Sequence, residues 1–432
     1  MADAAGGLLP LWRYAGFVAR PALKLVLAVR TANGKEDPAR RGERFGRASA
    51  PRPAGNLVWV HAASVGEITA ALPLVEALTA RGHNVLATTG TVTSARVAAE
   101  RLPAGAVHQF VPLDIVPYLS RFLDYWRPSA ALFVESEIWP TTIGELERRG
   151  IPRIVVNGRM SERSHGGWRR WPGAARALFG ELTACLAQTS ADAERFSDLG
   201  VKNVHISGNL KFDVAPLPID EAELAALKAA LNGRPCWVAA STHAGEEDMV
   251  AFAHARLSAR WPDLLTFVVP RHPERGPAIA QRLNPAGQGD SVALRSRRDP
   301  ITPNTRFYVA DSIGEIGLFF RLSPVAFVGG SLVDIGGHNP IEPIRLDAAV
   351  VSGPHVANFR SIYADLGNAG GIVSVEDGDM LAHAVGGLLS DPKSAQASVA
   401  LAKAVLDQHS GSVGRTLDVL TPFLGPATER AA

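Results

Sequence analysis

The stretch LVWVHAASVGEITAALPLVEALTARGHNVLATT, residues 57–89, decides the fold class. Two short runs rich in apolar residues, 57–62 and 84–89, enclose a longer segment whose apolar residues recur at the spacing of a helix. A strand, a helix and a second strand at this spacing form a βαβ unit, and such units build parallel sheets. The sequence therefore predicts an α/β fold.

The same alternation continues along the chain, with one interruption. The segment KFDVAPLPID, residues 211–220, has no clear periodicity and contains two prolines, which indicates a linker. Because a single core rarely grows beyond about 250–300 residues, a chain of 432 residues is expected to form two domains. The expected strands are 57–62, 84–89, 106–111, 130–135, 153–158, 184–189 and 203–208 before the linker, and 236–242, 264–272, 306–311, 324–331, 348–354 and 371–377 after it.

Two doubly wound parallel-sheet domains joined in this way would face each other across a cleft. Ligands of open α/β sheets bind at the carboxyl ends of the strands, so the loops that follow the strands are the candidate site. We expect a basic and apolar N-terminal segment, a first domain, a linker, a second domain, and a C-terminal helical tail that packs back on the first domain. These span residues 1–52, 53–212, 213–220, 221–405 and 406–432.

Charge and cysteine content exclude several classes of protein. A formal net charge of +2 argues against a dedicated nucleic-acid binder. The two cysteines, Cys185 and Cys236, lie far apart in apolar segments. This excludes a disulfide framework and a cysteine-based zinc site, and it fits a reducing compartment.

The N-terminal segment is strongly basic. Residues 1–52 hold ten Lys and Arg against four Asp and Glu, and they surround the apolar stretch 8–30. Basic residues interrupt that stretch, so it lacks the run of about 18 apolar residues that a membrane span needs, and no signal-peptide cleavage site follows. The pattern suits contact with an anionic membrane surface, or else a helix packed on the domain. The apolar residues are Trp12, Phe17, Leu23, Leu25, Val26 and Leu27.

The segment HAASVGE, residues 61–67, places small residues and a carboxylate at the end of a predicted strand. Glu67 falls in the first turn of a predicted helix, where an acidic side chain is common for purely structural reasons. It could alternatively be a general base that accepts a hydroxyl proton from a bound ligand. Ser64 and Gly66 favour the second interpretation, since small residues let a ligand approach the backbone.

Two further loops of the first domain carry charge. In VESEIWP, residues 134–140, Glu135 and Glu137 would point the same way if the strand continued, and one pKa would then be raised; the alternative is a polar loop that caps a helix. The loop 157–170 could bind a phosphorylated or carboxylated substrate through its arginines, or it could be an exposed basic loop. The charged residues concerned are Arg159, Arg163, Arg169 and Arg170, with Lys211 near the linker as an anion contact or a solvated hinge residue.

Three loops of the second domain also follow predicted strands: 240–248, 269–276 and 328–343. In the last, VGGSLVDIGGHNPIEP, several glycines precede a helix whose free N–H groups could hold a phosphate, and Glu342 could accept from ribose hydroxyls. In the loop 240–248, the candidates are Ser241 and Thr242, which could also be N-caps. In the loop 269–276, they are Arg271 and His272, which suit either an acidic ligand or an ordinary exposed surface.

Spacing argues against other common sites. The chain contains no GxxxxGK[ST] and no HExxH. GQGDSV at 287–292 lacks the third glycine of a dinucleotide fingerprint and is followed by a strand, and GGSLV fails the GxSxG pattern of a nucleophile elbow. Asp377 and Asp379 resemble a metal-binding pair, but a turn before a helix accounts for them better.

In chain order, these motifs resemble those of the 3-deoxy-D-manno-octulosonic acid (Kdo) transferase family of Gram-negative bacteria. They are HAASVGE, FVESEIWP, NGRMSERS, GNLKFD, AASTHAGEE, VPRHPERG and GGSLVDIGGHNPIEP, within a match from about residue 8 to about residue 410. The resemblance implies a GT-B fold with an acceptor-binding first domain and a CMP-Kdo-binding second domain. It implies transfer of Kdo from CMP-Kdo to lipid IVA, the lipid A precursor, at the cytoplasmic face of the inner membrane, without a metal or another cofactor.

The resemblance also implies roles for individual residues. Glu67 would be the catalytic base, supported by Glu137 or Glu135, and no residue would ligate a metal. The implied substrate-binding residues are Ser64, Gly66, Arg159, Lys211, Ser241, Thr242, Arg271, His272, Pro273, Gly329, Gly330, Ser331, Gly337, His338, Asn339 and Glu342.

The implied chemistry needs one base. A cytidylate leaving group surrounded by N–H groups and basic side chains needs no protonation, and attack from the opposite face inverts the sugar centre, by analogy with glycoside hydrolysis. One alternative is a GT-B transferase or epimerase that uses a UDP-sugar, which competition between CMP and UDP would separate. Another is a non-catalytic membrane-surface scaffold, which absence of nucleotide binding would support.

Overall fold

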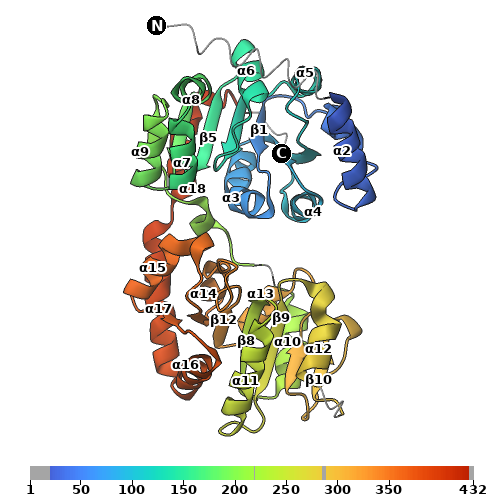
Figure 1. The fold of residues 1–432 in the computed structure, drawn as a ribbon, viewed down its shortest axis with the longest axis vertical. Coiled ribbons are helices and arrows are strands. Elements are labelled where there is room, and N and C mark those ends of the chain that lie inside the picture. The colour runs from blue at the N-terminus through green and yellow to red at the C-terminus, as the bar shows by residue number, and fades with distance from the viewer. Residues whose placement is uncertain (1–19, 218, 285–288, 428–432) are drawn as a thin grey trace. The chain divides into compact units, whose positions relative to one another are not determined.

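The computed structural model describes residues 20–217, 219–284 and 289–427 (Figure 1). The chain divides into two compact units, one formed by residues 1–215 with 409–432 and the other by residues 216–408. Each unit contains a seven-stranded sheet in which every paired strand is parallel to its neighbour. The predicted α/β class, with two doubly wound parallel sheets, is confirmed.

The sheet of the first unit has the strand order β3-β2-β1-β4-β5-β6-β7. Its strands are β1 (Leu57–His61), β2 (Asn84–Thr89), β3 (Ala106–Phe110), β4 (Ala130–Val134), β5 (Arg153–Gly158), β6 (Ala184–Ala187) and β7 (Val204–Ile206). Its helices are α2 (Arg20–Ala32), η1 (Arg41–Phe45), α3 (Val65–Ala80), α4 (Val92–Arg101), α5 (Val116–Trp126), α6 (Pro140–Arg148), α7 (Glu162–Arg169), α8 (Pro172–Phe179), α9 (Ser190–Asp198), η2 (Leu210–Asp213), α18 (Ser412–Leu420) and η6 (Thr421–Phe423).

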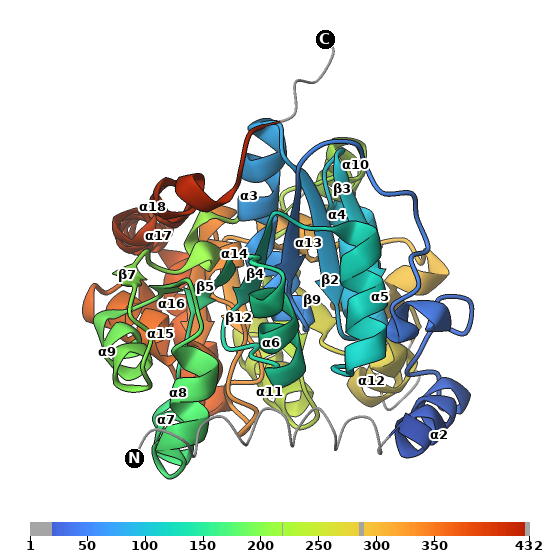
Figure 2. The same ribbon diagram turned by 90° about the horizontal axis from the view of Figure 1, so that it is seen from above.

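Helices cover both faces of this sheet (Figure 2). One face packs against α3, α4, η2 and α18, and the other against α5, α6, α8 and α9. The central strands β1 and β4 are buried along their whole length and, apart from His61, apolar, because helices cover both faces of the sheet. Leu417 and Leu420 bring α18 into the first core, and the Asp213 carboxylate accepts the backbone N–H groups of Gly411 (2.7 Å) and Val413 (2.6 Å) beside the start of this helix.

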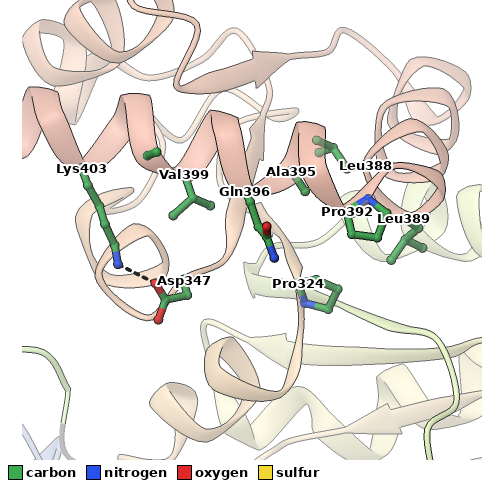
Figure 3. A pocket seen from close by; sticks show the side chains of 10 residues that line it. Pro324, Asp347, Leu388, Leu389, Pro392, Ala395, Gln396, Val399 and Lys403 are labelled. Atoms are coloured by element: carbon green, nitrogen blue, oxygen red, sulfur yellow. Dashed lines mark hydrogen bonds and ion pairs between the residues drawn. The ribbon is translucent and has the colours of Figure 1, made fainter.

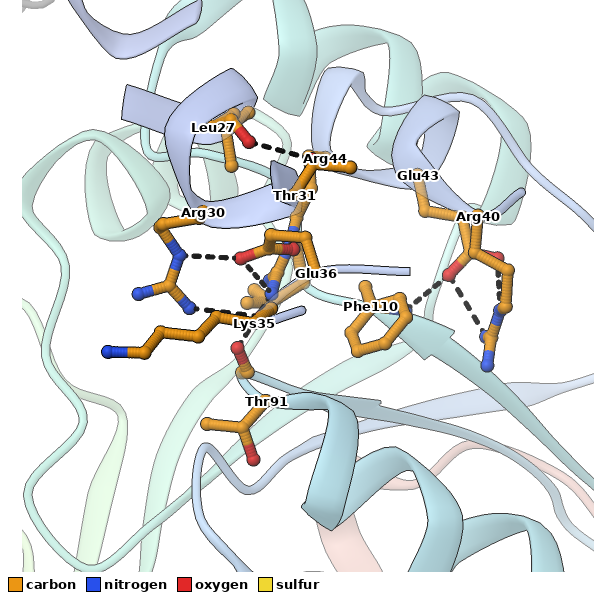
Figure 4. Close-up of polar contacts among 12 residues, drawn as sticks. Leu27, Arg30, Thr31, Lys35, Glu36, Arg40, Glu43, Arg44, Thr91 and Phe110 are labelled. Carbon is orange, nitrogen blue, oxygen red and sulfur yellow. Dashed lines mark hydrogen bonds and ion pairs between the residues drawn. The ribbon is translucent and has the colours of Figure 1, made fainter. Parts of the chain in front are cut away.

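A buried ion-pair network attaches α2 to the first sheet (Figure 4). Glu36 accepts from Arg30 on α2 at 2.8 Å and from Arg44 at 3.0 Å. The Arg44 guanidinium also donates to the carbonyls of Gly90 (2.6 Å) and Val111 (3.1 Å), which follow β2 and β3. The network therefore places α2 at the carboxyl edge of the sheet.

The outer face of α2 is apolar. Leu25, Val26 and Val29 are exposed, whereas Leu27 is buried against the unit. Within the described ranges, no helix is both long and apolar enough to cross a membrane. Trp12 and Phe17, which the sequence assigned to the same apolar segment, lie outside the described residues.

The sheet of the second unit has the strand order β10-β11-β9-β8-β12-β13-β14. Its strands are β8 (Cys236–Thr242), β9 (Leu265–Pro270), β10 (Val292–Leu294), β11 (Phe307–Val309), β12 (Val325–Val328), β13 (Ala349–Ser352) and β14 (Ile372–Ser374). Its helices are α10 (Glu221–Leu231), α11 (Glu246–Ser258), η3 (Pro273–Arg275), α12 (Gly276–Leu283), η4 (Arg295–Arg297), α13 (Ile316–Leu322), α14 (Ile341–Arg345), η5 (Ala357–Phe359), α15 (Arg360–Asn368), α16 (Gly378–Ser390) and α17 (Pro392–His409).

Helices α11, α12, α16 and α17 cover one face of the second sheet, and α10 and α13 cover the other. A cavity of about 500 Å³ lies beside α17, between Val399 and Pro324, with the Lys403–Asp347 ion pair at its border (Figure 3). Pro324 and Asp347 precede β12 and β13, so this cavity lies at the amino edge of the sheet. Ligands of such sheets bind at the opposite, carboxyl edge.

The strand order reverses direction near the centre of each sheet, between β1 and β4 in the first and between β8 and β12 in the second. The connections that leave neighbouring strands there run to opposite sides, which opens a crevice at the carboxyl edge. Four of the sequence motifs follow these four strands: HAASVGE after β1, VESEIWP after β4, ASTHAGEED after β8 and VGGSLVDIGGHNPIEP after β12.

Candidate active site

Glu67 is held at the start of α3 by two hydrogen bonds to its carboxylate. Ser64, the N-cap of α3, donates its hydroxyl to Glu67 Oε1 at 2.6 Å and accepts the Glu67 backbone N–H at 3.3 Å. The Ala63 backbone N–H donates to Glu67 Oε2 at 2.9 Å. The carboxylate is therefore fixed against its own helix, at the switch point of the first sheet.

Burial raises the pKa of Glu67 above its ordinary value. The hydrogen bonds from Ser64 and Ala63 favour the ionised form and oppose this, while the negative charges of Glu137 and Glu135 add to it. The structure thus brings the three candidate carboxyl groups close enough to interact. A carboxylate with a raised pKa is a stronger base than an ordinary glutamate.

Glu137 has its own partners. Its Oε2 accepts the Trp139 indole N–H at 2.9 Å and lies 3.8 Å from His61 Nε2, on β1. His61 first, and then the Trp139 hydrogen bond, hold the pKa of Glu137 below its usual value despite partial burial. His61 Nε2 is buried and makes no hydrogen bond to any described residue. Glu137 therefore stays ionised and adds negative charge beside Glu67.

Glu135 behaves differently from Glu137, and the expected strand continuation is wrong. Strand β4 ends at Val134, and Glu135 has a left-handed backbone conformation with φ 62°. Its carboxylate contacts Lys211 Nζ at 3.1 Å. The two glutamates consequently do not form a carboxylate pair with one raised pKa, since a lysine neutralises the first and the second faces His61. Non-glycine residues with such a backbone cluster at functional sites.

In the second unit, one buried carboxylate organises the loop after β12. Glu246, the first residue of α11, is fully buried, and it accepts the backbone N–H groups of His243 (2.9 Å), Gly330 (2.7 Å), Ser331 (3.0 Å) and Leu332 (3.0 Å). These N–H groups are therefore not free to bind a phosphate; the N–H groups that the sequence predicted to be free are those at the start of the helix that follows the loop. The Glu246 side chain thus occupies the position at which this loop could otherwise bind an anionic ligand.

Glycine is required at this contact. A Cβ at Gly329 would lie 2.6 Å from the Ser241 carbonyl oxygen and 2.9 Å from Glu246 Oε2. Ser241 itself has φ 57°, and the pairing of β8 with β9 shifts register between Ala240 and Thr242. Ser241 and Thr242 are not N-caps, because α11 begins at Glu246 with Gly245 before it.

A cluster of basic rings and guanidinium groups remains available to an anion. His243 and His338 face each other with their Nε2 atoms 2.9 Å apart, and the His272 ring lies edge-on to His243 at 5.9 Å. Arg271 and His272 are exposed at the end of β9. Arg275 is engaged by the Glu247 carboxylate at 2.9 and 3.1 Å.

The rest of the glycine-rich segment folds back on itself. The Gly337 N–H donates to the Gly330 carbonyl at 2.7 Å, which returns His338 to the beginning of the loop. Asn339 accepts the Ile341 N–H at 3.1 Å and donates to Glu342 at 3.3 Å. The helix that follows, α14, is only five residues long. Its first backbone N–H, that of Ile341, already donates to the Asn339 side chain.

An apolar pocket of about 240 Å³ lies in the first unit beside the carboxylates. Two residues that line it, Ala63 and Trp139, donate hydrogen bonds to the carboxylates of Glu67 and Glu137, respectively. Its wall on α2 consists of Leu23, Val26, Leu27 and Arg30, and the remaining residues that line it include His61, Val111, Pro112, Leu113, Asp114 and Thr142. Arg159, in contrast, is exposed after β5 and is not among the residues that line it.

Most of the chain is similar in sequence to known transferases. Residues 39–214 match the family model of 3-deoxy-D-manno-octulosonic-acid transferase (kdotransferase). The chain is 33% identical over 407 residues to the 3-deoxy-D-manno-octulosonic acid transferase of Haemophilus influenzae, covering 92% of this chain and 94% of that protein. The chain belongs to the Kdo transferase family. It is also 35% identical over 395 residues to the 3-deoxy-D-manno-octulosonic acid transferase of Bordetella pertussis, with 88% and 91% covered.

The fold of this transferase is shared more widely. A glycosyltransferase from Rickettsia africae superimposes with a TM-score of 0.55 over 86% of this chain and 100% of that one, at 9% sequence identity. At that identity the likeness concerns the fold alone, and it agrees with the GT-B architecture of two parallel-sheet units. The transferase is thus a GT-B glycosyltransferase.

Three residues of this site were not singled out from the sequence. His61 lies within a predicted strand, where a histidine looks like any half-apolar core residue. His243 directly follows the predicted Ser241-Thr242 pair, so its place after a strand was a usable signal. Glu246 was one of three consecutive acidic residues, 246–248, and nothing in the sequence distinguishes the buried Glu246 and Glu247 from the exposed Asp248.

Proposed function

We propose that this transferase moves Kdo from CMP-Kdo to lipid IVA by a single inverting displacement, with Glu67 as the general base. The observation that carries the proposal is the Glu67 carboxylate, oriented by Ser64 and Ala63, made more basic by burial, and placed beside an apolar pocket. A glutamate needed only to cap α3 would gain nothing from a raised pKa.

In this mechanism an acceptor hydroxyl of lipid IVA attacks the anomeric carbon of Kdo. Glu67 takes the hydroxyl proton as the new C–O bond forms, and the bond to the phosphate oxygen breaks, with its electron pair leaving on CMP. The sugar passes through an oxocarbenium-like state, by analogy with glycoside hydrolysis. Arg271 and the histidines of the second unit would stabilise the charge of the leaving phosphate without protonating it. No metal takes part in the proposed steps, and we expect transfer to persist in EDTA.

Mass spectrometry of lipid IVA incubated with CMP-Kdo and the protein tests this function directly. The product is expected to gain the mass of one or more Kdo residues, and the reaction is expected to be inhibited by CMP but not by UDP. Lipid IVA left unchanged, or inhibition by UDP in place of CMP, would contradict the proposal. The second result would favour a UDP-sugar enzyme of the same fold.

The pH dependence should report the pKa of Glu67. Transfer requires ionised Glu67, so activity falls as the pH drops through its raised pKa. Glu137→Gln removes a negative charge that raises this pKa, and we expect the acid limb of kcat/KM to move to lower pH. Ser64→Ala removes a hydrogen bond that lowers the pKa of Glu67, and we therefore expect the acid limb of kcat/KM to move to higher pH. Shifts in the same direction for both variants would show that another group sets the limb.

We further propose that the protein acts at the cytoplasmic face of the inner membrane, with α2 at the lipid surface. The side chains of Leu25 and Val29, one helical turn apart, are exposed, Lys24 beside them is exposed as well, and residues 1–52 are basic. Apolar and basic residues together favour anionic lipid. The Glu36–Arg44 network places this surface at the same edge of the first sheet as Glu67.

Vesicle flotation tests this surface. We expect the protein to float with vesicles that contain phosphatidylglycerol and to bind phosphatidylcholine vesicles less. The double variant Leu25→Glu, Val29→Glu should lose flotation, because each charge must be desolvated to enter the lipid interface. Leu401→Glu, at an exposed leucine of α17, is the matched control and should float normally. Equal flotation of the double variant would contradict the proposal.

A further inference from the structure

The second unit contains a pair of histidines whose Nε2 atoms point at each other. The rings of His243 and His338 are parallel within 4°, their centroids are 5.1 Å apart, and their Nε2 atoms are 2.9 Å apart. Two imidazole nitrogens at this distance form a hydrogen bond only if one carries a proton and the other does not. In the neutral pair, therefore, one ring is protonated at Nε2 and the other at Nδ1.

The surrounding backbone holds this pair in place. One oxygen of Glu246 accepts both the His243 N–H and the Gly330 N–H, so it ties together the two loops that approach each other. Gly330 lies against both rings: a Cβ there would be 3.0 Å from His338 Cδ2 and 3.4 Å from His243 Cδ2. Tyr363 donates its hydroxyl to the His338 carbonyl at 3.0 Å. The contact is thus preorganised before any ligand arrives.

The ionisable groups that act on the pair come from the segment after β9 and from α11. Arg271, His272 and Arg275, after β9, disfavour a further proton on His243, whereas Glu246 on α11 favours one. Burial, followed by His243, Arg271 and His272, lowers the pKa of His338 to about 4. Burial also lowers the pKa of His243. Without a ligand, both rings are therefore neutral near neutral pH.

We propose that the His243–His338 pair takes up one proton from solvent when the phosphodiester of the nucleotide donor binds beside it. This inference rests on the proposed function, in which the second unit binds a cytidylate donor. A bound anion favours the charged form of a nearby base. The proton enters at the free Nδ1 of the ring that already donates through Nε2, so the hydrogen bond between the rings is kept and becomes charge-assisted.

As a consequence, the histidine pair carries a positive charge mainly while the phosphodiester is bound. Gly330 and Ser331 cannot donate to the phosphate because Glu246 occupies their N–H groups. The protonated pair supplies the missing stabilisation beside Arg271. His243 and His338 are thus donor-positioning residues, and the affinity for a phosphodiester should rise as the pH falls, by up to about tenfold per pH unit for one linked proton.

Calorimetric titration with the methyl ester of CMP tests the proposal. This probe is a phosphodiester like the donor and does not itself titrate between about pH 6.5 and 8, the range in which a perturbed histidine does. Titrations at one pH in buffers of different ionisation enthalpy give the number of protons taken up. We expect uptake by the unsubstituted protein to approach one proton at the lower pH. His243→Asn and His338→Asn should each reduce uptake to near zero.

Matched variants show which histidine takes up the proton. His383→Asn, at an exposed histidine of α16, should keep normal uptake and affinity. Binding without proton uptake by the unsubstituted protein would overturn the proposal even if the variants failed to fold. Uptake that disappeared in His272→Asn but persisted in both pair variants would also overturn it, by assigning the proton to His272. No binding of the ester at any pH would instead contradict the proposed donor itself.

Discussion

Glu67→Gln is expected to lower kcat for Kdo transfer by about 10²–10⁴, the contribution typical of a general base. The amide cannot accept the acceptor's proton, but it retains the size of the side chain beside Ser64 and Ala63. Affinity for CMP should not change, because the proposed nucleotide site belongs to the other unit. Steady-state transfer rates, together with CMP binding, separate these two effects.

A glutamate on the same helix provides the control. Glu76 is exposed on α3, and Glu76→Gln should transfer Kdo at a rate close to that of the unsubstituted protein. If Glu67→Gln kept its activity as well, Glu67 would be a helix-capping residue only. The base would then have to be sought elsewhere, with Glu137 as the next candidate because it is ionised and adjacent.

Glu246→Ala is expected to be the most destabilising change in the second unit. Four backbone N–H groups lose their acceptor, and each buried donor left without a partner costs about 1–3 kcal/mol. A loss of about 4 kcal/mol or more corresponds to a decrease in Tm of roughly 8–16 °C for a domain of this size. Differential scanning calorimetry measures this decrease in the transition of the second unit.

The neighbouring acid is a matched control for this experiment. Asp248 also lies in the first turn of α11, but it is exposed and pairs with Arg282 on the surface. Asp248→Asn should change stability by less than about 1 kcal/mol, as exposed ion pairs do. A Tm of Glu246→Ala within 2 °C of the unsubstituted protein would show that water replaces the carboxylate at little cost.

The alternation of elements was predictable because the strands are buried on both faces. Runs such as 57–60 and 236–240 have no reason to be continuously apolar unless helices cover both sides of a parallel sheet. The place of the candidate loops was predictable for the same reason, since in a parallel sheet every loop after a strand lies at one edge. Periodicity and topology together therefore sufficed for the fold class and the candidate edge.

The partners of the charged side chains were not predictable. The spacing of Glu135 and Glu137 suggested a carboxylate pair, but the left-handed turn at Glu135 sends one to Lys211 and leaves the other near His61. The glycines after β12 indicated a loop that a ligand could approach, but nothing in them indicated that Glu246, 84 residues away from Gly330, accepts the Gly330 N–H. Such contacts join distant parts of the chain, and no local pattern records them.

The backbone at Glu135 has a consequence for how this gene can change over time. With φ 62°, a side chain at this position costs roughly 1–2 kcal/mol that glycine would not. Glycine at this position would remove that cost, but it would also remove the carboxylate that pairs with Lys211. Selection for folding stability alone would therefore favour glycine, and retention of the acid requires selection for its contact with the lysine.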